Sequence, residues 1–156
     1  MGMRFAVDAM FGRLARWLRM SGYDTLYDVE LKDGRLIMMA KEEGRVLLTR
    51  DRDAYGRAVK EGVRAVFISS TDFREQLRQM EELGVIFRET PEHARCPYCN
   101  KELVRADKKD IKAKVPERVG EAYDKFWTCE GCGRVYWHGG HWKNIMETLR
   151  SIRKDG

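Results

Sequence analysis

The sequence predicts an α/β fold in which a layered parallel sheet is followed by a small cysteine-bearing unit and a terminal helix. From Met3 to about Phe87, short apolar runs alternate with longer amphipathic stretches. Strands separated by helices of this length need right-handed crossovers, which produce a parallel sheet with helices on both faces. Near residue 90 a polar linker interrupts the pattern, and all four cysteines follow it. The expected units span 3–90, 94–141 and 142–153.

The elements of the first unit follow from apolar periodicity and turn residues. Strands are expected in the runs RFAVD (4–8), DTLYD (24–28), VLLT (46–49), AVFI (65–68) and VIF (85–87). Helices are expected over 12–20, 33–43, 54–61 and from 73 onward. Gly22, Gly44 and Gly62 each follow one of the first three helices, where a glycine commonly ends a helix.

The C-terminal part combines aromatic residues with a helical pattern. Apolar residues recur at helical spacing from Trp142 to Ile152, so the chain is expected to end in an amphipathic helix docked on the main body. The aromatic side chains of this part are expected mainly in a core, and base stacking by one or two of them is the alternative. They are Phe126, Trp127, Tyr136, Trp137 and Trp142.

Basic charge is concentrated in the same part of the chain. Residues 1–93 hold 16 Lys+Arg and 16 Asp+Glu, whereas residues 94–156 hold 14 and 9, which accounts for the net charge of +5. This asymmetry indicates an anionic partner such as nucleic acid, although a modestly basic surface can also serve solubility. Neither a membrane span of roughly 20 apolar residues nor a signal-peptide pattern is found, so a cytoplasmic location is expected.

Two C-x2-C knuckles predict a metal site. Cys96 and Cys99 lie in CPYC, Cys129 and Cys132 lie in CEGC, and twenty-nine residues separate the pairs. Each tight turn can direct two sulfurs at one ion, and two such turns complete a closed tetrahedron for structural Zn²⁺. Disulfides or buried thiols are the alternatives, which the paired spacing and a cytoplasmic setting disfavour. The nearby YWHGGHW motif, with its two histidines, is not needed to complete this site.

A second set of candidate ligands consists of aspartates at the ends of predicted strands. Asp8 ends the first strand, Asp51 ends the third, and Asp53 faces the same side if the chain stays extended there. Asp33 begins the helix that leads into the third strand. Because ligands of open α/β sheets bind beyond the carboxyl ends of the strands, these four acids are expected to converge on one cleft.

A cluster of like charges requires a bound cation or raised pKa values. Oxygen ligands in an incomplete cage suit Mg²⁺ or Mn²⁺, and such ions can activate water for phosphodiester hydrolysis. Arg50 and Arg52 are then expected to face phosphate. Arg13 and Arg16, in one row with Arg19, can attract an RNA backbone.

Structural roles are the alternatives for these charged residues. Asp33 and Asp53 can cap the helices that follow them, and the arginine row can be a solvated helix face. Asp24 and Asp28, which flank the second strand, are interpreted as turn and surface residues.

The combined motifs resemble a known family. VDAMFGRLARWLRMSGYDT, GRVLLTRDRD, RCPYCNKEL and FWTCEGCGRVYWHGGHW are similar to the PIN-like ribonucleases with a C-terminal zinc ribbon, the family named after the C-terminal domain of the mut-seven exonuclease. The resemblance covers about Met3 to Leu149. It implies a PIN-like sheet, cleavage of RNA with Mg²⁺ or Mn²⁺, and a ribbon that aids substrate binding.

The resemblance also assigns roles by position. The catalytic acids fall on Asp8, Asp33, Asp51 and Asp53, and the ribbon end matches at His141 and Trp142, for which the resemblance implies contacts with the RNA substrate. Gly34 and Arg35 stand where relatives of this type often have further acids, which leaves Glu30 and Asp28 as alternatives to Asp33. The ribbon end reads GGHW where a serine is expected before the histidine.

Two functions from different classes remain open on the sequence. One is a metal-dependent ribonuclease, and the other is a non-catalytic RNA-binding or ribosome-associated module whose acidic cluster is too depleted for catalysis. A D-x-D phosphotransferase would need its acidic pair on the first strand, whereas here the pair follows the third. A phospho-receiver domain would need an acidic pair after the first strand and a lysine after the fifth, and VIFRET supplies no such lysine.

Overall fold

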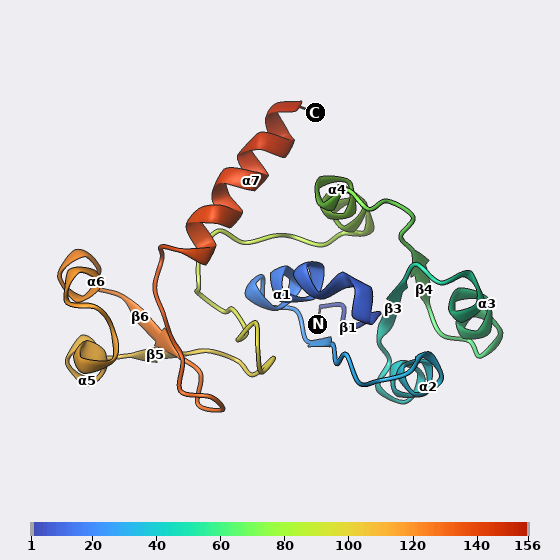
Figure 1. The fold of residues 1–156 in the computed structure, drawn as a ribbon, viewed down its shortest axis with the longest axis horizontal. Coiled ribbons are helices and arrows are strands. Elements are labelled where there is room, and N and C mark those ends of the chain that lie inside the picture. The colour runs from blue at the N-terminus through green and yellow to red at the C-terminus, as the bar shows by residue number, and fades with distance from the viewer. Residues whose placement is uncertain (1, 156) are drawn as a thin grey trace.

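The computed structural model describes residues 2–155, with the side chains of all of these except 141 and 153–155. The N-terminal part is built on a parallel four-stranded sheet with the order β2-β1-β3-β4, which confirms the predicted α/β class. Its strands are β1 (Phe5–Val7), β2 (Thr25–Leu26), β3 (Val46–Thr49) and β4 (Ala65–Phe67). Helices α1 (Gly12–Met20) and α4 (Phe73–Leu83) cover one face, and α2 (Asp33–Glu43) and α3 (Arg52–Lys60) cover the other (Figure 1).

Alternation of side chains along the strands divides the core between the two faces. Phe5 and Val7 pack on the α1 and α4 side, whereas Ala6 between them packs against α2 and α3. In β3, Leu48 belongs to the first cluster and Leu47 to the second. A strand that is apolar on both faces is typical of a sheet covered by helices on both sides.

The strand order fixes where a ligand can bind. The chain leaves β1 for β2 on one side and then returns past β1 to form β3 on its other side. Connections that diverge from neighbouring strands leave a crevice at their carboxyl ends, and ligands of such sheets bind there. In this molecule the crevice lies between the ends of β1 and β3, where Asp8 and Asp51 are found.

The prediction of a fifth strand at 85–87 is wrong. The backbone there has side-chain hydrogen-bond partners: Ile86 N–H donates to the Tyr23 hydroxyl at 2.8 Å, and Arg88 N–H donates to Ser21 Oγ at 3.1 Å. Val85 and Phe87 remain buried in the core. The segment therefore connects the sheet to the cysteine-bearing part instead of extending the sheet.

The cysteine-bearing part contains a three-stranded antiparallel sheet with the order β5-β6-β7. Its strands are β5 (Val104–Ala106), β6 (Phe126–Thr128) and β7 (Val135–Tyr136). Between β5 and β6 the chain forms α5 (Lys108–Ile111), the 3₁₀ turn η2 (Lys112–Lys114) and α6 (Glu117–Ala122). These elements form most of the inter-knuckle insert, residues 100–128, which lies far from α2 and α3 (Figure 1).

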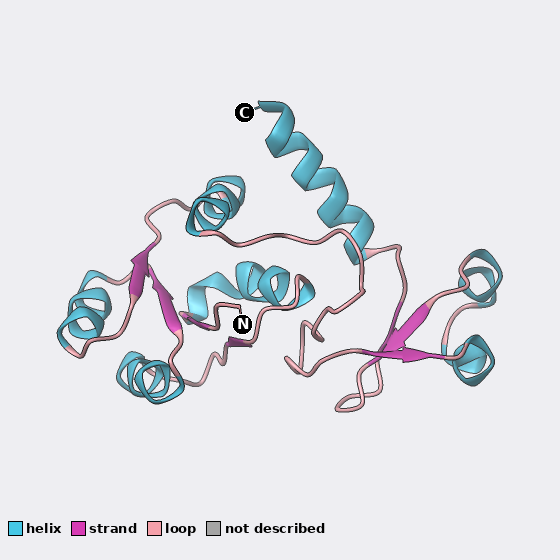
Figure 2. Cartoon of the chain, turned by 180° about the vertical axis from the view of Figure 1, so that it is seen from behind, coloured by secondary structure: helices cyan, strands magenta, loops and turns pink. Residues whose placement is uncertain are grey.

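The chain ends in α7 (His141–Asp155), the long helix seen in Figure 2. Its apolar residues Ile145, Leu149 and Ile152 are buried in the same cluster as residues of α1, α4 and the cysteine-bearing part. The expected docking of a terminal amphipathic helix is thus confirmed. No helix of the described residues has the length and apolar character to cross a membrane.

Candidate functional site

Asp8 lies at the carboxyl end of β1 and is held by three hydrogen bonds. Its N–H donates to Leu48 O at 2.9 Å, which continues the pairing of β1 with β3. Its Oδ1 accepts from Met10 N at 3.1 Å and thereby caps the 3₁₀ turn η1 (Ala9–Phe11). Its Oδ2 accepts from the Thr49 hydroxyl at 3.0 Å. The side chain is 8% exposed, so this carboxylate is fixed in position at the rim of the core.

Thr49 connects the ends of β1 and β3. While its hydroxyl donates to Asp8, its Oγ1 accepts from Asp51 N–H at 3.0 Å. The sequence analysis did not identify this residue. Its only signal is its place as the last residue of β3, two positions before Asp51.

Asp51 and Asp53 have different positions. Asp51 is the N-cap of α3 and accepts from Ala54 N–H at 3.0 Å, so the helix begins at Arg52 and not at Ala54 as predicted. Asp53 consequently lies in the first helical turn and not in an extended segment, and its side chain is exposed. The capping role that was considered for Asp53 belongs to Asp51.

Asp33 is the first residue of α2, and the N-cap position is Lys32, which makes no side-chain cap. Burial raises the pKa of Asp33, and the negative charges of Asp8 and Asp51 raise that pKa further, with partial opposition from Arg57. Asp8 and Asp51 are linked through Thr49 at the ends of β1 and β3, and Asp33 lies within electrostatic range of both. We call Asp8, Asp33 and Asp51 the acidic cluster.

The acidic cluster is open. Among the described residues, only the four cysteines bring three or more potential ligand atoms within 4.8 Å of one another. Each carboxylate oxygen has two lone pairs, so Asp8 and Asp51 retain acceptor capacity beyond their internal hydrogen bonds. Carboxylates at this wider spacing suit a hard cation that keeps part of its water shell, as Mg²⁺ does.

The four cysteine sulfurs form a compact group at the two knuckles. The Cys96 and Cys132 sulfurs are 3.8 Å apart. Tetrahedral zinc with bonds of about 2.3 Å places its sulfurs about 3.8 Å from one another. The donor set and its spacing therefore fit a metal such as zinc.

Matching turns build the two knuckles. Cys96 O accepts from Asn100 N–H at 2.8 Å, and Cys129 O accepts from Gly133 N–H at 2.7 Å. Asn100 and Gly133 both have left-handed backbone conformations, with φ of 64° and 78°. Glycine and asparagine tolerate this conformation best, which explains why they follow the second cysteine of each pair.

The thiols of this group compete for protons. Hydrogen bonding with Cys132 raises the pKa of Cys99 to about 12. Burial opposes ionisation of Cys132, but hydrogen bonds from Arg134 outweigh it and lower the pKa of Cys132 to about 6. Four adjacent thiolates repel one another, so a divalent cation is required before all four can ionise.

The acids and the cysteines both lie within one known family domain. A family model, the Mut7-C RNAse domain, matches residues 3–149. The chain belongs to this family. The match makes it a ribonuclease-type domain with RNA as the implied substrate, and it confirms the resemblance found in the sequence. Neither a curated protein nor a solved structure matches the chain.

The arginines of this Mut7-C domain are divided between surface and core. The Arg13 guanidinium lies 4.0 Å from the Phe73 ring centroid, and that of Arg52 lies 4.9 Å from the Phe67 centroid. Both side chains are exposed, as is Arg16, while Arg50 is half-buried. Stacking on a ring restricts the flexible side chain while leaving the charge accessible.

Arg19 does not belong to the solvated arginine row. Its side chain is buried and donates to Thr25 O at 3.0 Å and to Pro97 O at 2.8 Å. Its carbonyl accepts from Arg95 N–H at 2.8 Å. Arg19 therefore joins α1 to β2 and to the first knuckle, and it is not available to RNA.

Of the two ribbon-end residues assigned by resemblance, the structure describes the side chain of Trp142 but not that of His141. Trp142 is 1% exposed and packs edge-on against Tyr136 with ring centroids 5.6 Å apart. This burial places Trp142 in the core and contradicts its assignment as a contact for RNA. The His141 side chain lies outside the described part of the chain.

Asp24 is part of an ionic network and not a simple turn residue. Its Oδ1 accepts from the buried Arg45 at 2.9 Å and from Asn100 Nδ2 at 2.7 Å. Burial alone would raise the pKa of Asp24, but the hydrogen bonds from Arg45 and Asn100 outweigh it and lower the pKa to about 2. This network joins the sheet to the first knuckle. The sequence interpretation of Asp24 missed it because the partners are distant in the chain.

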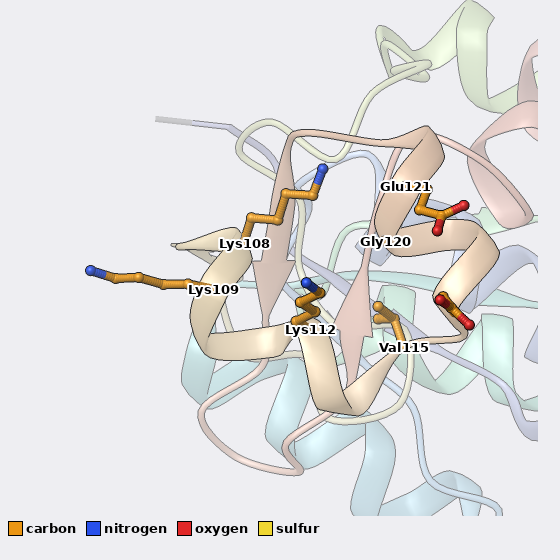
Figure 3. Close-up of a pocket in the computed structure, with 7 residues that line it drawn as sticks. Lys108, Lys109, Lys112, Val115, Gly120 and Glu121 are labelled. Carbon is orange, nitrogen blue, oxygen red and sulfur yellow. The ribbon is translucent and has the colours of Figure 1, made fainter.

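One cavity lies in the inter-knuckle insert, away from the acidic cluster. It measures about 640 Å³, with Val115 and Gly120 in its lining. Figure 3 shows lysines from α5 and η2 on one side of it and Glu121 from α6 on the other. Lys108 pairs with Asp124 at 3.2 Å, whereas the Lys109 side chain extends away from the cavity. Mixed charges of this kind do not favour one class of ligand.

Proposed function

We propose that this domain is a metal-dependent ribonuclease that hydrolyses RNA phosphodiester bonds with Mg²⁺ or Mn²⁺. The observation that supports it best is that the Thr49 hydroxyl links Asp8 and Asp51 at the crevice between β1 and β3, with Asp33 near enough for their charges to raise its pKa. Such a cluster is costly without a cation, and phosphate oxygens can complete the coordination of a partly hydrated ion.

Each residue has a proposed role at the acidic cluster. Asp8 and Asp51 would hold the ion, with Asp33 binding it directly or through water. Asp53, which is exposed in the first turn of α3, would contribute a carboxylate at the outer edge of the acidic cluster. A divalent ion at this position supplies activated water and stabilises the leaving oxygen. Arg50 and Arg52 would orient the phosphate, and the exposed Arg13 and Arg16 would attract the flanking backbone.

The cysteine site and its surroundings have a supporting role in the proposal. Zn²⁺ on the four cysteines would be structural, because four protein ligands leave no open position for catalysis. Residues 94–141 would form a ribbon that aids RNA binding, beside a PIN-like unit at 3–90 and a helix at 142–153. The exposed lysines of the insert, such as Lys112 and Lys114, support this role. A cytoplasmic location remains our proposal.

Hydrolysis of a labelled RNA with Mg²⁺ or Mn²⁺ tests the proposal. Asp8→Asn and Asp51→Asn should each lower the rate by more than about 100-fold, since losing an ion ligand removes several kcal/mol of transition-state stabilisation. Asp53→Asn should have a smaller effect, and Asp110→Asn, an exposed acid of the insert, should have none. Circular dichroism would establish that each variant is folded. Full activity in the Asp8→Asn variant would refute the assignment.

One observation favours the alternative of a non-catalytic RNA-binding module. The carboxylates are not gathered into a compact ligand set, unlike the cysteines. If the folded wild type binds RNA but fails to cleave it across a range of Mg²⁺ and Mn²⁺ concentrations, the binding function replaces the nuclease.

A further inference from the structure

We infer that the groove between α2 and α3 is a binding subsite for one nucleotide of the RNA next to the scissile phosphate. This inference rests on the proposed function, because it places substrate at the acidic cluster. In this subsite Arg57 binds a phosphate, and the base lies on the apolar floor that Ile37 and Met38 provide.

The groove is lined at one end by Gly34, the residue next to Asp33. It measures about 480 Å³, within the range of pockets that hold small organic molecules. Gly34, next to Asp33, lies at its mouth, and the Lys41–Glu61 ion pair of 3.2 Å lies at the other end. Lys41 follows Gly34 by seven positions in α2, which corresponds to a rise of about 10 Å along the helix. A groove of this length is too short for a helical peptide but can hold a single nucleotide.

The charge of the groove complements a phosphate. Arg57 and Lys60 line it and are exposed, and neither has a carboxylate within 4.0 Å among the described residues. The Arg57 guanidinium reaches the residue next to Asp33, because a Cβ atom built on Gly34 would lie 3.1 Å from Arg57 Nη2. A phosphate bound by Arg57 would therefore lie beside the acids, at the position of a phosphate that neighbours the cleaved one.

The floor of the groove complements a base. Ile37 is buried, whereas the adjacent Met38 is 53% exposed and offers an apolar surface to a ligand in the groove. The flexible thioether of methionine adapts to flat and irregular partners, so this floor can accept different bases.

Gly34 keeps the mouth of the groove open. A Cβ atom built at this position would lie 3.1 Å from Arg57 Nη2, closer than most real contacts. A side chain at Gly34 would thus displace the guanidinium from the mouth. This provides a second way to disturb the subsite without removing a charge.

The test measures binding separately from cleavage. In an Asp8→Asn background without added chelator, fluorescence anisotropy would follow a labelled eight-residue oligouridylate over a range of salt concentrations. Arg57→Gln should weaken binding about five- to tenfold at low salt and reduce the slope of log affinity against log salt by about 0.7, the value for one lost single-strand phosphate contact. Arg64→Gln removes an exposed cation before β4, at the opposite end of the sheet, and should change neither quantity.

A cross-linking experiment locates the base. The same oligonucleotide with 4-thiouridine should cross-link to the peptide that contains Ile37 and Met38, and Gly34→Val should abolish this cross-link while the protein stays folded. Cross-links confined to the cysteine-bearing part, or equal affinities for Arg57→Gln and Arg64→Gln, would overturn the subsite. If wild type still cleaves RNA in that case, the subsite alone fails. If wild type neither binds nor cleaves RNA, the proposed function fails as well.

Discussion

The cysteine site and the acidic cluster, two candidate cation sites among the described residues, are built in opposite ways. The cysteine site is assembled by two turns that close on backbone hydrogen bonds, and its four sulfurs lie within 4.8 Å of one another. In the acidic cluster a single hydroxyl, that of Thr49, links the Asp8 carboxylate to the Asp51 backbone, and no three ligand atoms of the cluster come so close. A compact site completes its own coordination, whereas an open one leaves positions for water and substrate.

Removing one cysteine ligand should have the largest effect on stability. Cys96 is fully buried in the core that also contains Trp17 and Trp142. Loss of this ligand would therefore destabilise the core as well as the knuckle. Cys96→Ser should cost about 4 kcal/mol, part of the 10–16 kcal/mol typical of structural zinc. At about 2–4 °C per kcal/mol for a chain of this size, the melting temperature should fall by about 8–16 °C.

Thermal unfolding followed by circular dichroism, with zinc content from a chromogenic chelator, checks this prediction. Tyr98→Ser is the matched control, because Tyr98 is an exposed non-ligand in the same knuckle. A Cys96→Ser variant with full zinc content and an unchanged melting temperature would show that the two sites do not differ as described.

The Asp24 network should give the next largest effect and a defined pH dependence. The pKa of Asp24 is lowered to about 2 from 3.8, so its ionised form stabilises the fold by about 2 kcal/mol at neutral pH. This contribution is complete above the unfolded pKa of about 3.9 and disappears as the pH falls toward 2. Asp24→Asn should lose it at pH 7 and show a flatter profile in acid.

Urea unfolding between pH 7 and pH 2.5 measures this contribution. Asp28→Asn, an exposed acid four residues away, should behave like wild type. Equal acid sensitivity of wild type and Asp24→Asn would mean that other carboxylates control the acid transition.

Thr49→Val separates structure from activity at the acidic cluster. The substitution keeps the shape of the side chain but removes the hydroxyl that bonds to Asp8 and Asp51. Stability should fall by about 1–2 kcal/mol. RNA hydrolysis should fall by about tenfold or more, because both acids lose a positioning contact.

Thr25→Val is the control for this variant, since Thr25 is equally buried and its hydroxyl donates to Tyr23 O at 2.9 Å. It should show a similar loss of stability in urea but unchanged hydrolysis. Parallel losses of activity in both variants would assign a purely structural role to Thr49.

Asp33→Asn should have the smallest effect on stability, with the opposite sign. Because the pKa of Asp33 is raised in the fold, the folded state binds the proton more tightly, and wild-type stability increases as the pH falls through the folded pKa. Removing this charge should stabilise the protein at pH 7 by a few tenths of a kcal/mol. Mn²⁺ should raise the melting temperature of wild type more than that of Asp33→Asn. An Asp33→Asn variant less stable than wild type would argue against repulsion in the cluster.

Local sequence signals are sufficient to predict most of the helices and strands. The helix predicted over 33–43 is observed with those bounds, and Gly44 ends it in a left-handed conformation with φ of 65°. The segment 85–87 has an equally apolar sequence but is not a strand. Its hydrogen-bond partners are Tyr23 and Ser21, more than sixty residues earlier, and no local pattern reports them.

For the candidate sites too, the sequence does not report contacts between residues that are distant in the chain. The cysteine pairs are specified by spacing, and the structure gathers their four sulfurs. Of the strand-end acids, Asp8 and Asp51 are linked through Thr49. Periodicity placed Arg19 in one row with the exposed Arg13 and Arg16, and it could not show that the Arg19 side chain is buried and donates to Pro97 O. Trp142 was ambiguous for the same reason, because a buried and a stacking tryptophan look alike in sequence. Thr49 has a common residue type and was recognised only through its partners.

The terminal helix also bears on how the protein is made. Residues 142–152 complete the core against α1 and α4, the helices that cover one face of the first sheet. During synthesis the part of this core that α7 closes stays exposed to solvent until the ribosome has translated α7. Early release of the nascent chain would leave this apolar surface uncovered, so quality-control chaperones should engage truncated products there.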